Sequence, residues 1–282
     1  MTKLISLIIP TYGRDNEVKE LLSSLEKQTC DKNDFEIIIV DQNDKINLSP
    51  IVTSFSGSLN IIHHKSSDKG IAKAKNKGIK LAKAPIITFP DDDCMYYPDT
   101  IANALNYLND HPQIDILYGR LYDRKTQKNI MRNWPQRNKE VNIFNFHYTY
   151  SAVTAFIRRN NIMFDINFGV GSSYGIGEEL DYLLQTFERK LTSFYTPSVD
   201  IWHPELNPAI MSTEKVYYYA KGFGAICRKH ISFIMLYTFC MSNAFQILQI
   251  VKYIIVFNRM LAYKRWLGLK GRIVGFISFK KM

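Results

Sequence analysis

The stretch PIITFPDDDC, residues 85–94, joins an apolar run to three adjacent aspartates. The run is short and rich in β-branched residues, which predicts a buried strand. Three adjacent carboxylates repel one another at its end unless a positive charge neutralises them. A hard divalent cation would do so, because Asp91 and Asp93 share one side of an extended chain and can reach one ion. The alternative is a solvated acidic turn.

Strands and amphipathic helices alternate on the N-terminal side of this stretch. Apolar runs predict strands at 4–10, 35–40 and 59–63, and apolar residues at helical spacing predict helices at 17–28 and 70–82. This alternation is typical of a mainly parallel sheet with helices on both faces. Polar residues follow the strands at their carboxyl ends, the edge where open α/β sheets bind ligands.

The same pattern continues beyond the aspartates. We expect helices at 98–108 and 179–187, strands at 114–122 and 150–158, and a last strand pair at 191–195 and 198–202 around Pro197. A glycine-rich loop at 169–177 precedes the second of these helices, and it could order over a bound ligand as a lid.

The composition indicates a packed globular protein. The chain has 282 residues, of which 46% are hydrophobic and 22% charged, which excludes disordered and collagen-like chains. The net charge of +10 resides in the tail: residues 214–282 hold 12 Lys and Arg and a single acid, Glu214, whereas residues 1–213 hold 24 and 25. A basic tail rich in apolar residues favours a membrane surface over nucleic acid, and no stacking platform of a nucleic-acid-binding module accompanies it.

The tail itself predicts amphipathic helices. Residues 231–251 carry no charge and are long enough to span a bilayer. Polar residues recur on one helical stripe, however: Thr238, Ser242, Gln246, Gln249 and Lys252. A second basic and apolar segment follows at 253–279. Three arrangements remain open, namely helices that cover the protein's own core, peripheral contact with an anionic membrane leaflet, and a true span.

The opening of the chain does not resemble a signal peptide. Lys3 is followed by a short apolar run that leads directly into polar residues. Four cysteines form neither a disulfide framework nor a CxxC pair. We therefore expect a cytoplasmic location, peripheral on the inner face of the cell membrane if the tail contacts lipid.

Seven segments, in order, resemble motifs of family 2 glycosyltransferases of the GT-A fold. They are LIIPTYGR at 7–14, EIIIVD at 36–41, GIAKAKNKG at 70–78, FPDDDC at 89–94 with Tyr97-Pro98, GEELD at 177–181, WHP at 202–204, and KGFGA at 221–225 with Arg228-Lys229-His230. The resemblance implies an α/β, Rossmann-like nucleotide-sugar-binding fold with a mainly parallel central sheet, plus C-terminal amphipathic helices. It implies a catalytic domain over 1–213, with a nucleotide-sugar half at 1–98 and an acceptor half at 99–213, followed by a helical extension over 214–282.

The resemblance implies that the first two strand ends hold the donor nucleotide. Pro10, Thr11 and Tyr12 would wall the base, with Tyr12 stacking on it unless it is simply an aromatic residue of a surface turn. Asp41 would accept a hydrogen bond from the uracil N3–H.

Further residues would bind the diphosphate and the sugar. Arg14 and Lys75 would contact the diphosphate, although the family usually has Arg where Lys75 stands, and Lys lacks the bidentate geometry. Asp68 would contact the ribose or else begin a helix as its N-cap. Asp92 would contact the ribose or the sugar.

The same resemblance implies a divalent metal, Mn²⁺ or Mg²⁺. Asp93 would be the main ligand, Asp91 would help directly or through water, and His203 would complete the shell unless it is a surface residue. An imidazole ligand shifts the preference toward Mn²⁺.

The GEELD segment implies a general base. Glu179 matches the family's catalytic position, with Glu178 and Asp181 as alternatives. A carboxylate at this point would take the proton of an acceptor hydroxyl. Acidic residues in the first turn of a helix are also favourable with the helix dipole, and both roles can hold.

The expected function is therefore an inverting, metal-assisted glycosyltransferase. It would move a sugar from a nucleotide-sugar, a UDP-sugar by the expected Asp41 contact, to a glycan or lipid-linked saccharide acceptor in cell-surface polysaccharide synthesis. One alternative is a catalytically degenerate, membrane-associated sugar-binding or scaffold protein. The other is a nucleotidyltransferase, which should carry a glycine-rich loop after its first strand, whereas residues 11–15 are short and poor in glycine.

Overall fold

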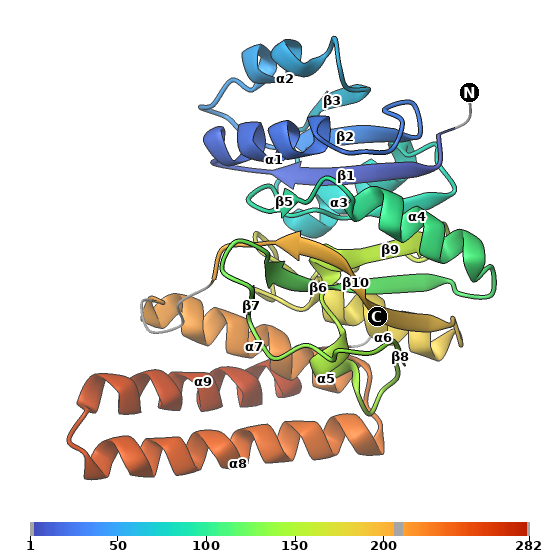
Figure 1. Cartoon of the computed structure of the whole chain (residues 1–282). Helices are drawn as coiled ribbons and strands as arrows, with labels where there is room; N and C mark the ends of the chain where they lie inside the picture. The colour runs from blue at the N-terminus through green and yellow to red at the C-terminus, as the bar shows by residue number, and fades with distance from the viewer. Residues whose placement is uncertain (1–2, 206–210, 281–282) are drawn as a thin grey trace. The chain divides into compact units, whose positions relative to one another are not determined.

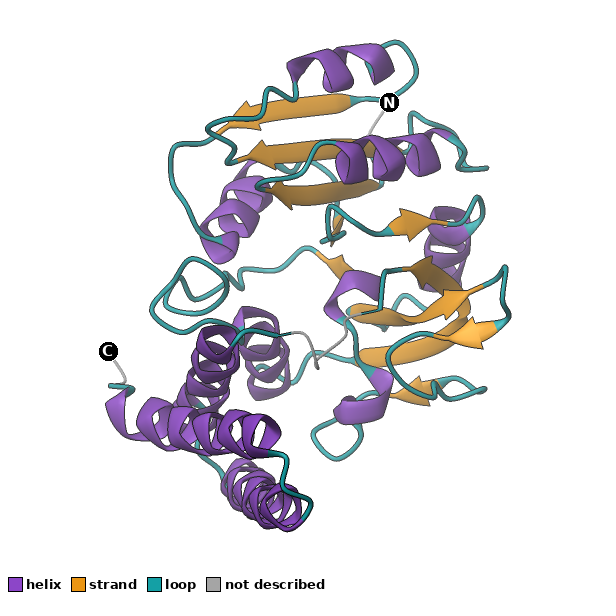
Figure 2. Ribbon diagram, turned by 90° about the vertical axis from the view of Figure 1, so that its left-hand side faces the viewer, coloured by secondary structure: helices purple, strands orange, loops and turns teal. Residues whose placement is uncertain are grey.

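The computed structural model describes residues 3–205 and 211–280, which form two compact units. The first unit comprises the described residues of 1–69, 73–162 and 186–206, and the second those of 70–72, 163–185 and 207–282. Figure 2 shows the strands of the first unit and the long helices of the second. The division of the chain at residue 213 into a catalytic domain and an extension stays a prediction.

The first unit is built on a ten-stranded sheet in the order β3-β2-β1-β4-β9-β6-β10-β5, with β7 paired to β6 and β8 to β10 (Figure 1). β1–β2, β2–β3, β1–β4 and β6–β10 run parallel, and β9 joins the two halves by antiparallel pairing to β4 and β6. The strands are β1 (Ile5–Thr11), β2 (Phe35–Asp41), β3 (Ile61–Lys65), β4 (Ile86–Thr88), β5 (Met95–Tyr96), β6 (Ile116–Asp123), β7 (Lys128–Asn129), β8 (Lys139–Glu140), β9 (Ala155–Arg158) and β10 (Ser193–Trp202).

Helices flank the strands of this sheet on both faces (Figure 1). They are α1 (Asn16–Glu26), α2 (Ser49–Phe55), α3 (Ile71–Leu81), α4 (Thr100–Asp110) and the short α5 (Phe146–Thr149). Every residue of β1 and of β2 is buried, as a strand covered on both faces must be. The predicted α/β fold with a mainly parallel sheet is therefore confirmed.

Two predicted elements differ from the structure. The expected strand pair around Pro197 is a single strand, β10, whose register against β6 shifts between Tyr195 and Asp200. Extra residues in one strand are absorbed as a bulge, so proline is tolerated there without breaking the strand. The expected strand at 150–158 begins as a 3₁₀ turn, Ala152–Thr154, and becomes extended only at β9.

The second unit is mostly helical. It contains the start of α6 (Glu178–Glu188), then α7 (Thr213–Lys229), α8 (Phe233–Ile255) and α9 (Arg259–Ser278). Side chains of Ser212, Ser232 and Asn258 accept hydrogen bonds from backbone N–H groups of the first turns of α7, α8 and α9. The predicted tail helices are therefore present.

α7 and α9 approach one another through glycines. A Cβ atom on Gly224 would lie 1.9 Å from the carbonyl oxygen of Arg272, and one on Gly275 would lie 1.9 Å from that of Lys221. Only glycine permits backbones so close. Within the described residues, one helix, α8, is long and apolar enough to cross a membrane, and 11% of its apolar window is buried.

The packing of α3 on β1 can be tested at a glycine. A Cβ atom on Gly78 would lie 2.1 Å from Cγ2 of the buried Ile8. Gly78→Ala should therefore lower the free energy of unfolding by about 1–2 kcal/mol, because overpacking outweighs the better helix propensity of alanine. At Gly268 in α9 the nearest atom would be 3.5 Å away, so Gly268→Ala should instead add up to about 1 kcal/mol. Thermal unfolding followed by circular dichroism measures both, and a raised Tm for both variants would contradict the Gly78 packing.

Candidate active site

Two carboxylates and one imidazole converge at the edge of the sheet. Asp91 and Asp93 follow β4, and His203 follows β10. His203 Nε2 lies 3.3 Å from Asp91 Oδ2 and 3.4 Å from Asp93 Oδ1. One potential ligand atom from each of the three residues lies within 4.8 Å of the others. The donor set suits a divalent cation that accepts both oxygen and nitrogen ligands, such as Mn²⁺.

Hydrogen bonding around this Asp-Asp-His cluster also fits a cation. Asp93 Oδ1 is buried and accepts no hydrogen bond, although His203 is near it. His203 Nδ1 lies 2.7 Å from the carbonyl oxygen of Pro204. With a cation bound, a proton on Nδ1 would satisfy that carbonyl and leave the Nε2 lone pair available to the ion, as in histidines that bind metals.

The cluster shifts the protonation of its members in opposite directions. Burial raises the pKa of Asp91, but the hydrogen bond to His203 and the charges of Lys75 and His203 outweigh it, so the pKa lies below the usual carboxyl value. Burial lowers the pKa of His203, but the hydrogen bond to Asp91 and the charges of Asp91 and Asp93 raise it overall. Charge attraction therefore dominates over desolvation at both groups.

Arg14 pairs with two of the three adjacent aspartates, Asp92 and Asp93. Its guanidinium pairs with Asp92 Oδ1, and its Nη2 lies 2.8 Å from Asp93 Oδ2. Burial nevertheless raises the pKa of Asp92 above the usual value, against the lowering effect of Thr11 and Arg14. Lys75 on α3 is fully buried, and its charge lowers the pKa of Asp91. Both cations expected at the diphosphate therefore lie beside the acidic triplet.

Asp41, at the end of β2, is held by its own neighbours. Its Oδ1 accepts from the backbone and side-chain N–H groups of Asn43 at 2.8 and 2.9 Å. Its Oδ2 lies 3.0 Å from His63 Nε2 and 3.1 Å from Lys65 Nζ. Although burial acts to raise it, these bonds hold the pKa of Asp41 below the usual carboxyl value. A uracil N3–H would have to share one of these oxygens.

Sequence reasoning missed the roles of Asn43, His63 and Lys65 around Asp41. A signal for the latter two exists in the register: β2 and β3 run parallel with Asp41 opposite Lys65, and His63 lies two residues earlier on the same face of β3. Pairing of β2 with β3 cannot be read from either strand alone, so this contact depends on tertiary structure.

The remaining donor residues lie at the ends of β1 and β3. Pro10 and Thr11 are buried in β1, and the side chain of Thr11 faces Asp92, whose pKa it lowers. Tyr12 is 61% exposed, with Lys69 Nζ 5.0 Å from its ring centroid. Asp68 is exposed, and α3 begins only at Ile71. The exposed ring of Tyr12 therefore offers a face on which a planar ligand can stack.

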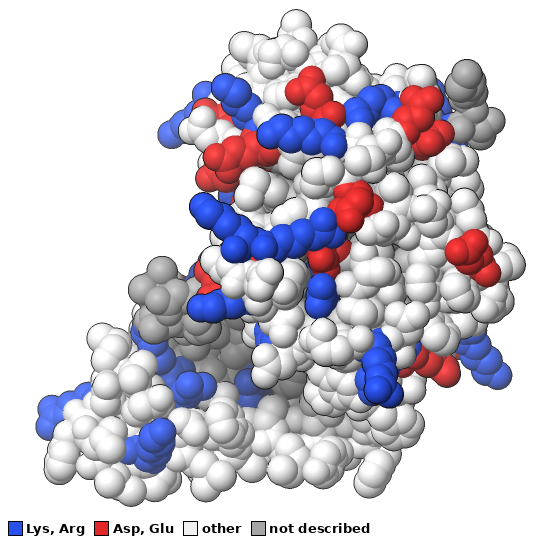
Figure 3. Space-filling view, in the orientation of Figure 1, with Lys and Arg blue, Asp and Glu red and all other residues white. Residues whose placement is uncertain are grey.

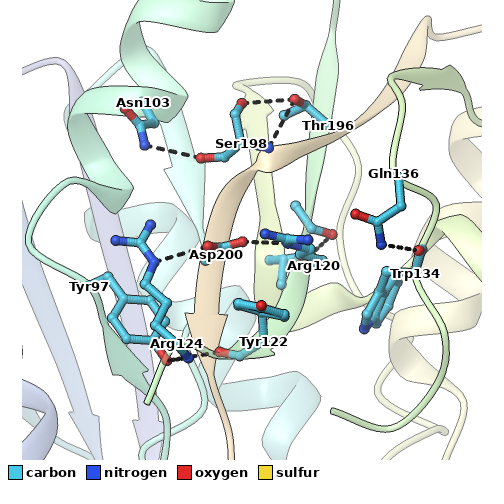
Figure 4. Close-up of polar contacts among 12 residues, drawn as sticks. Tyr97, Asn103, Arg120, Tyr122, Arg124, Trp134, Gln136, Thr196, Ser198 and Asp200 are labelled. Carbon is cyan, nitrogen blue, oxygen red and sulfur yellow. Dashed lines mark hydrogen bonds and ion pairs between the residues drawn. The ribbon is translucent and has the colours of Figure 1, made fainter. Parts of the chain in front are cut away.

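β10 reaches the Asp-Asp-His cluster after an ion-pair network that follows its bulge (Figure 4). Asp200 accepts from Arg120 Nε at 2.6 Å and from Arg124 Nε at 2.9 Å. The guanidiniums stack on Tyr122 and Tyr97, at 4.1 and 4.3 Å from the ring centroids. A buried carboxylate held by two stacked arginines fixes the strand three residues before His203. The sequence analysis did not identify this network.

The GEELD segment opens α6 in the second unit. Glu178 and Asp181 are buried, whereas Glu179 is half-buried. Asp181 Oδ1 accepts from Lys229 Nζ at 2.6 Å and lies 2.7 Å from His230 Nε2, while its Oδ2 accepts from Gln185 Nε2 at 2.8 Å. Burial acts to raise the pKa of Asp181, yet these partners lower it overall.

The C-terminal end of α7 therefore binds the first turns of α6 through Lys229 and His230. Lys229 also pairs with Asp165 at 2.6 Å. His230 is buried at Asp181. The loop 169–177 packs in the same unit: the hydroxyl of Tyr218 in α7 donates to the Ser172 carbonyl at 2.5 Å. Gly169, Gly171 and Gly177 of that loop adopt positive φ of 94°, 86° and 114°.

Comparison with solved structures supports the fold. S. aureus TarS 1–349 in complex with UDP matches with a TM-score of 0.60 at 20% identity, covering 98% of this chain and 90% of that one. The mannosyltransferase PcManGT from Pyrobaculum calidifontis, in complex with GDP-Man and Mn²⁺, matches with a TM-score of 0.59 at 14% identity, covering 98% of this chain and 74% of that one. At these identities the likeness is one of fold, the GT-A fold expected from the sequence.

Sequence relatives point the same way. A PGL/p-HBAD biosynthesis glycosyltransferase of Mycobacterium tuberculosis is 32% identical over 126 residues, which cover 44% of this chain and 48% of that protein. The poly(ribitol-phosphate) beta-N-acetylglucosaminyltransferase TarS of Staphylococcus aureus is 27% identical over 167 residues, covering 56% and 29%. The aligned part thus spans half or less of these relatives. The family model described as glycosyl transferase family 2 matches residues 6–180. The chain therefore belongs to glycosyl transferase family 2.

Proposed function

We propose that the protein transfers a sugar from a UDP-sugar to a glycan or lipid-linked saccharide in cell-surface polysaccharide synthesis, with inversion and with a divalent metal. The convergence of Asp91, Asp93 and His203 carries the proposal. Support for the nucleotide comes from TarS, a structural neighbour with complexes named for UDP and UDP-GlcNAc.

Asp91, Asp93 and His203 would hold Mn²⁺ or Mg²⁺. When bound, the ion supplies Lewis-acid stabilisation of the negative charge on the departing diphosphate. Arg14 and Lys75 lie beside the same carboxylates. We assign both cations to the diphosphate. When the donor binds, they would contact phosphate oxygens in place of the aspartates that they now face. Residues 1–98 would bind the donor and residues 99–213 the acceptor.

The walls of the nucleotide site follow from the strand ends. Tyr12 would stack on the base with its exposed ring, next to Pro10 and Thr11. Asp41 would receive the uracil N3–H on an oxygen that already accepts from Asn43 or faces His63 and Lys65. Asp68 and Asp92 would contact the ribose or the sugar.

Glu179 would be the general base of a single displacement at the anomeric carbon. Its side chain is half-buried, so it keeps access to an acceptor hydroxyl. Asp181 instead has both oxygens engaged by Lys229, His230 and Gln185 and a lowered pKa, which makes it a weak base. We therefore place Asp181 as a positioning residue for the start of α6, and Glu178 as the second candidate base.

The location proposed for the protein is the cytoplasmic face of the cell membrane. A lipid-linked acceptor is presented at that surface, and the basic, apolar segment 214–282 would contact it peripherally.

The metal and nucleotide roles can be tested together by calorimetry. UDP should bind in the presence of Mn²⁺, and Asp93→Ala should weaken that binding at least about 100-fold, since loss of a charged ligand removes several kcal/mol of metal affinity. Asp110→Ala, at an exposed position of α4, serves as the control and should bind as wild type does. Unchanged affinity in Asp93→Ala would refute the assigned ligand, and failure of wild type to bind UDP, GDP or CDP would refute the donor class.

The base can be tested by steady-state kinetics with UDP-sugars and lipid-linked saccharides. Glu179→Gln should lower kcat by about 100-fold or more while leaving KM for the donor nearly unchanged, because it removes only the proton acceptor. Glu178→Gln is the comparison. A variant Glu179→Gln as active as wild type, with Glu178→Gln inactive, would move the base to Glu178.

The positioning role of Asp181 predicts a stability effect with a defined pH dependence. Asp181→Asn should lower the free energy of unfolding by about 3 kcal/mol at neutral pH, because Lys229 and His230 lose their charged partner. The folded-state pKa of Asp181 is lowered, so its contribution is full above the ordinary carboxyl pKa of about 4 and is lost as the pH falls through the folded value. Urea unfolding across acidic pH should show the two proteins converging below about pH 4. A constant difference would contradict the ion pairing, and Asp110→Asn should match wild type throughout.

A further inference from the structure

The amphipathicity of α8 is inverted with respect to water. Its polar residues Thr238, Ser242, Asn243, Gln246 and Gln249 are buried or half-buried. This side of the helix packs along α9: Ser242 carbonyl oxygen accepts from Arg272 Nη1 at 2.6 Å, and a Cβ on Gly268 would lie 3.5 Å from Gln246 Oε1. A helix on a protein surface in water shows the opposite pattern, with the polar side outward.

The opposite side of α8 is apolar and uncovered within the described residues. We define the outer face of α8 by residues Leu236, Tyr237, Met241, Phe245, Leu248, Val251 and Ile255, which are between 43% and 68% exposed. The turn to α9 extends it with Val256 and Phe257, the latter 89% exposed. Soluble proteins rarely expose apolar surfaces this continuous unless something binds them.

The surroundings of the outer face are basic and aromatic. Residues 233–282 contain eight Lys and Arg and no acid. Figure 3 shows basic but no acidic side chains over the part formed by α8 and α9. Lys252 and Arg265 flank the ring of Tyr253 at 5.8 and 5.9 Å, and Lys270 lies 5.1 Å from the ring centroid of Trp266. Aromatic rings beside cations are typical of the headgroup region of a bilayer.

Two other occupants of the face are disfavoured. A second copy would bring two segments of charge +11 together, and like charges of this size repel. A transmembrane α8 would bring along α9, which packs on its polar side (Figure 1). α9 carries five Lys and Arg residues, Arg259, Lys264, Arg265, Lys270 and Arg272, which the hydrocarbon would not solvate.

We propose that α8 lies flat in the surface of an anionic membrane, with its outer face in the lipid and α9 between α8 and α7 on the aqueous side. The proposal deepens the peripheral contact named under the proposed function and rests on it for the location. α9 links the other two helices. Its glycines allow it to pack closely on α7, and its polar contacts with α8 leave the apolar side of α8 facing outward. The helices then dock the unit that carries Glu179 at the surface where a lipid-linked acceptor resides.

Vesicle flotation tests the docking with the full chain. The protein should float with equimolar phosphatidylcholine–phosphatidylglycerol vesicles, bind pure phosphatidylcholine much more weakly, and dissociate at high salt. Leu248→Glu should lower the affinity about tenfold or more, because it replaces an apolar side chain that the lipid would bury with a charged one. Arg259→Gln and Lys264→Gln should each lower it about fivefold.

The matched control is Phe144→Glu, which makes the same charge change at a 73% exposed apolar residue of the first unit. It should bind vesicles as wild type does. Equal losses in Leu248→Glu and Phe144→Glu, or no binding of wild type to anionic vesicles, would overturn the proposal. So would a concentration-dependent dimer in sedimentation that Leu248→Glu abolishes, since a second copy would then cover the face.

A fluorophore on Cys240 measures the depth of α8. Cys240 is exposed, Cys94 and Cys227 are buried, and Cys30→Ser removes the remaining half-buried thiol. Emission should shift to the blue on anionic vesicles, with stronger quenching by nitroxides near the headgroups than at the bilayer centre, since an interfacial helix enters only about 5–10 Å. Stronger quenching at the centre would show a span and overturn the flat placement.

UDP binding, measured on the same samples, separates the two proposals. Vesicle binding without UDP binding would support the docking of α8 on the membrane and refute the UDP-sugar donor. UDP binding without vesicle binding would do the reverse.

Discussion

Electrostatic repulsion among Asp91, Asp92 and Asp93 is the constraint around which the first unit is organised. The three carboxylates follow a strand in the interior of the sheet, where solvent screens them poorly. The structure brings a cation or imidazole to each of them from elsewhere in the chain: Arg14 after β1, Lys75 from α3 and His203 after β10. The lowered pKa of Asp91 and the raised pKa of His203 result from the attraction between these carboxylates and their positively charged neighbours.

The parallel arrangement makes this convergence possible. β1, β2 and β4 are neighbours with the same direction, so their carboxyl ends lie at one edge and the residues following each strand meet there. His203 reaches the same place because β10 runs parallel to β6 and is anchored by Asp200 just before its end. The second unit follows a similar rule, since the end of α7 supplies Lys229 and His230 to a carboxylate in the first turns of α6.

Periodicity and order of motifs were enough to predict the fold class, the main strands and helices, and the proximity of Asp91 to Asp93, because these depend on local spacing. They did not reveal that β10 is one bulged strand, that Arg14 pairs with Asp92 and Asp93, or that Asn43, His63 and Lys65 hold Asp41. Each of these depends on which strands are neighbours and in what register, and a one-residue change of register would reverse the faces.

The tail shows the same division. Its sequence by itself determined that 231–251 is an uncharged amphipathic helix in a basic segment, because helical spacing and charge are properties of the chain. Which side of that helix faces inward was decided only by tertiary structure. The Ser242 carbonyl and the Gln246 amide meet α9, whose glycines in turn pack on α7, and the apolar side is left outward. Amphipathicity specifies that the two sides differ, whereas the partner helix specifies which of them is buried.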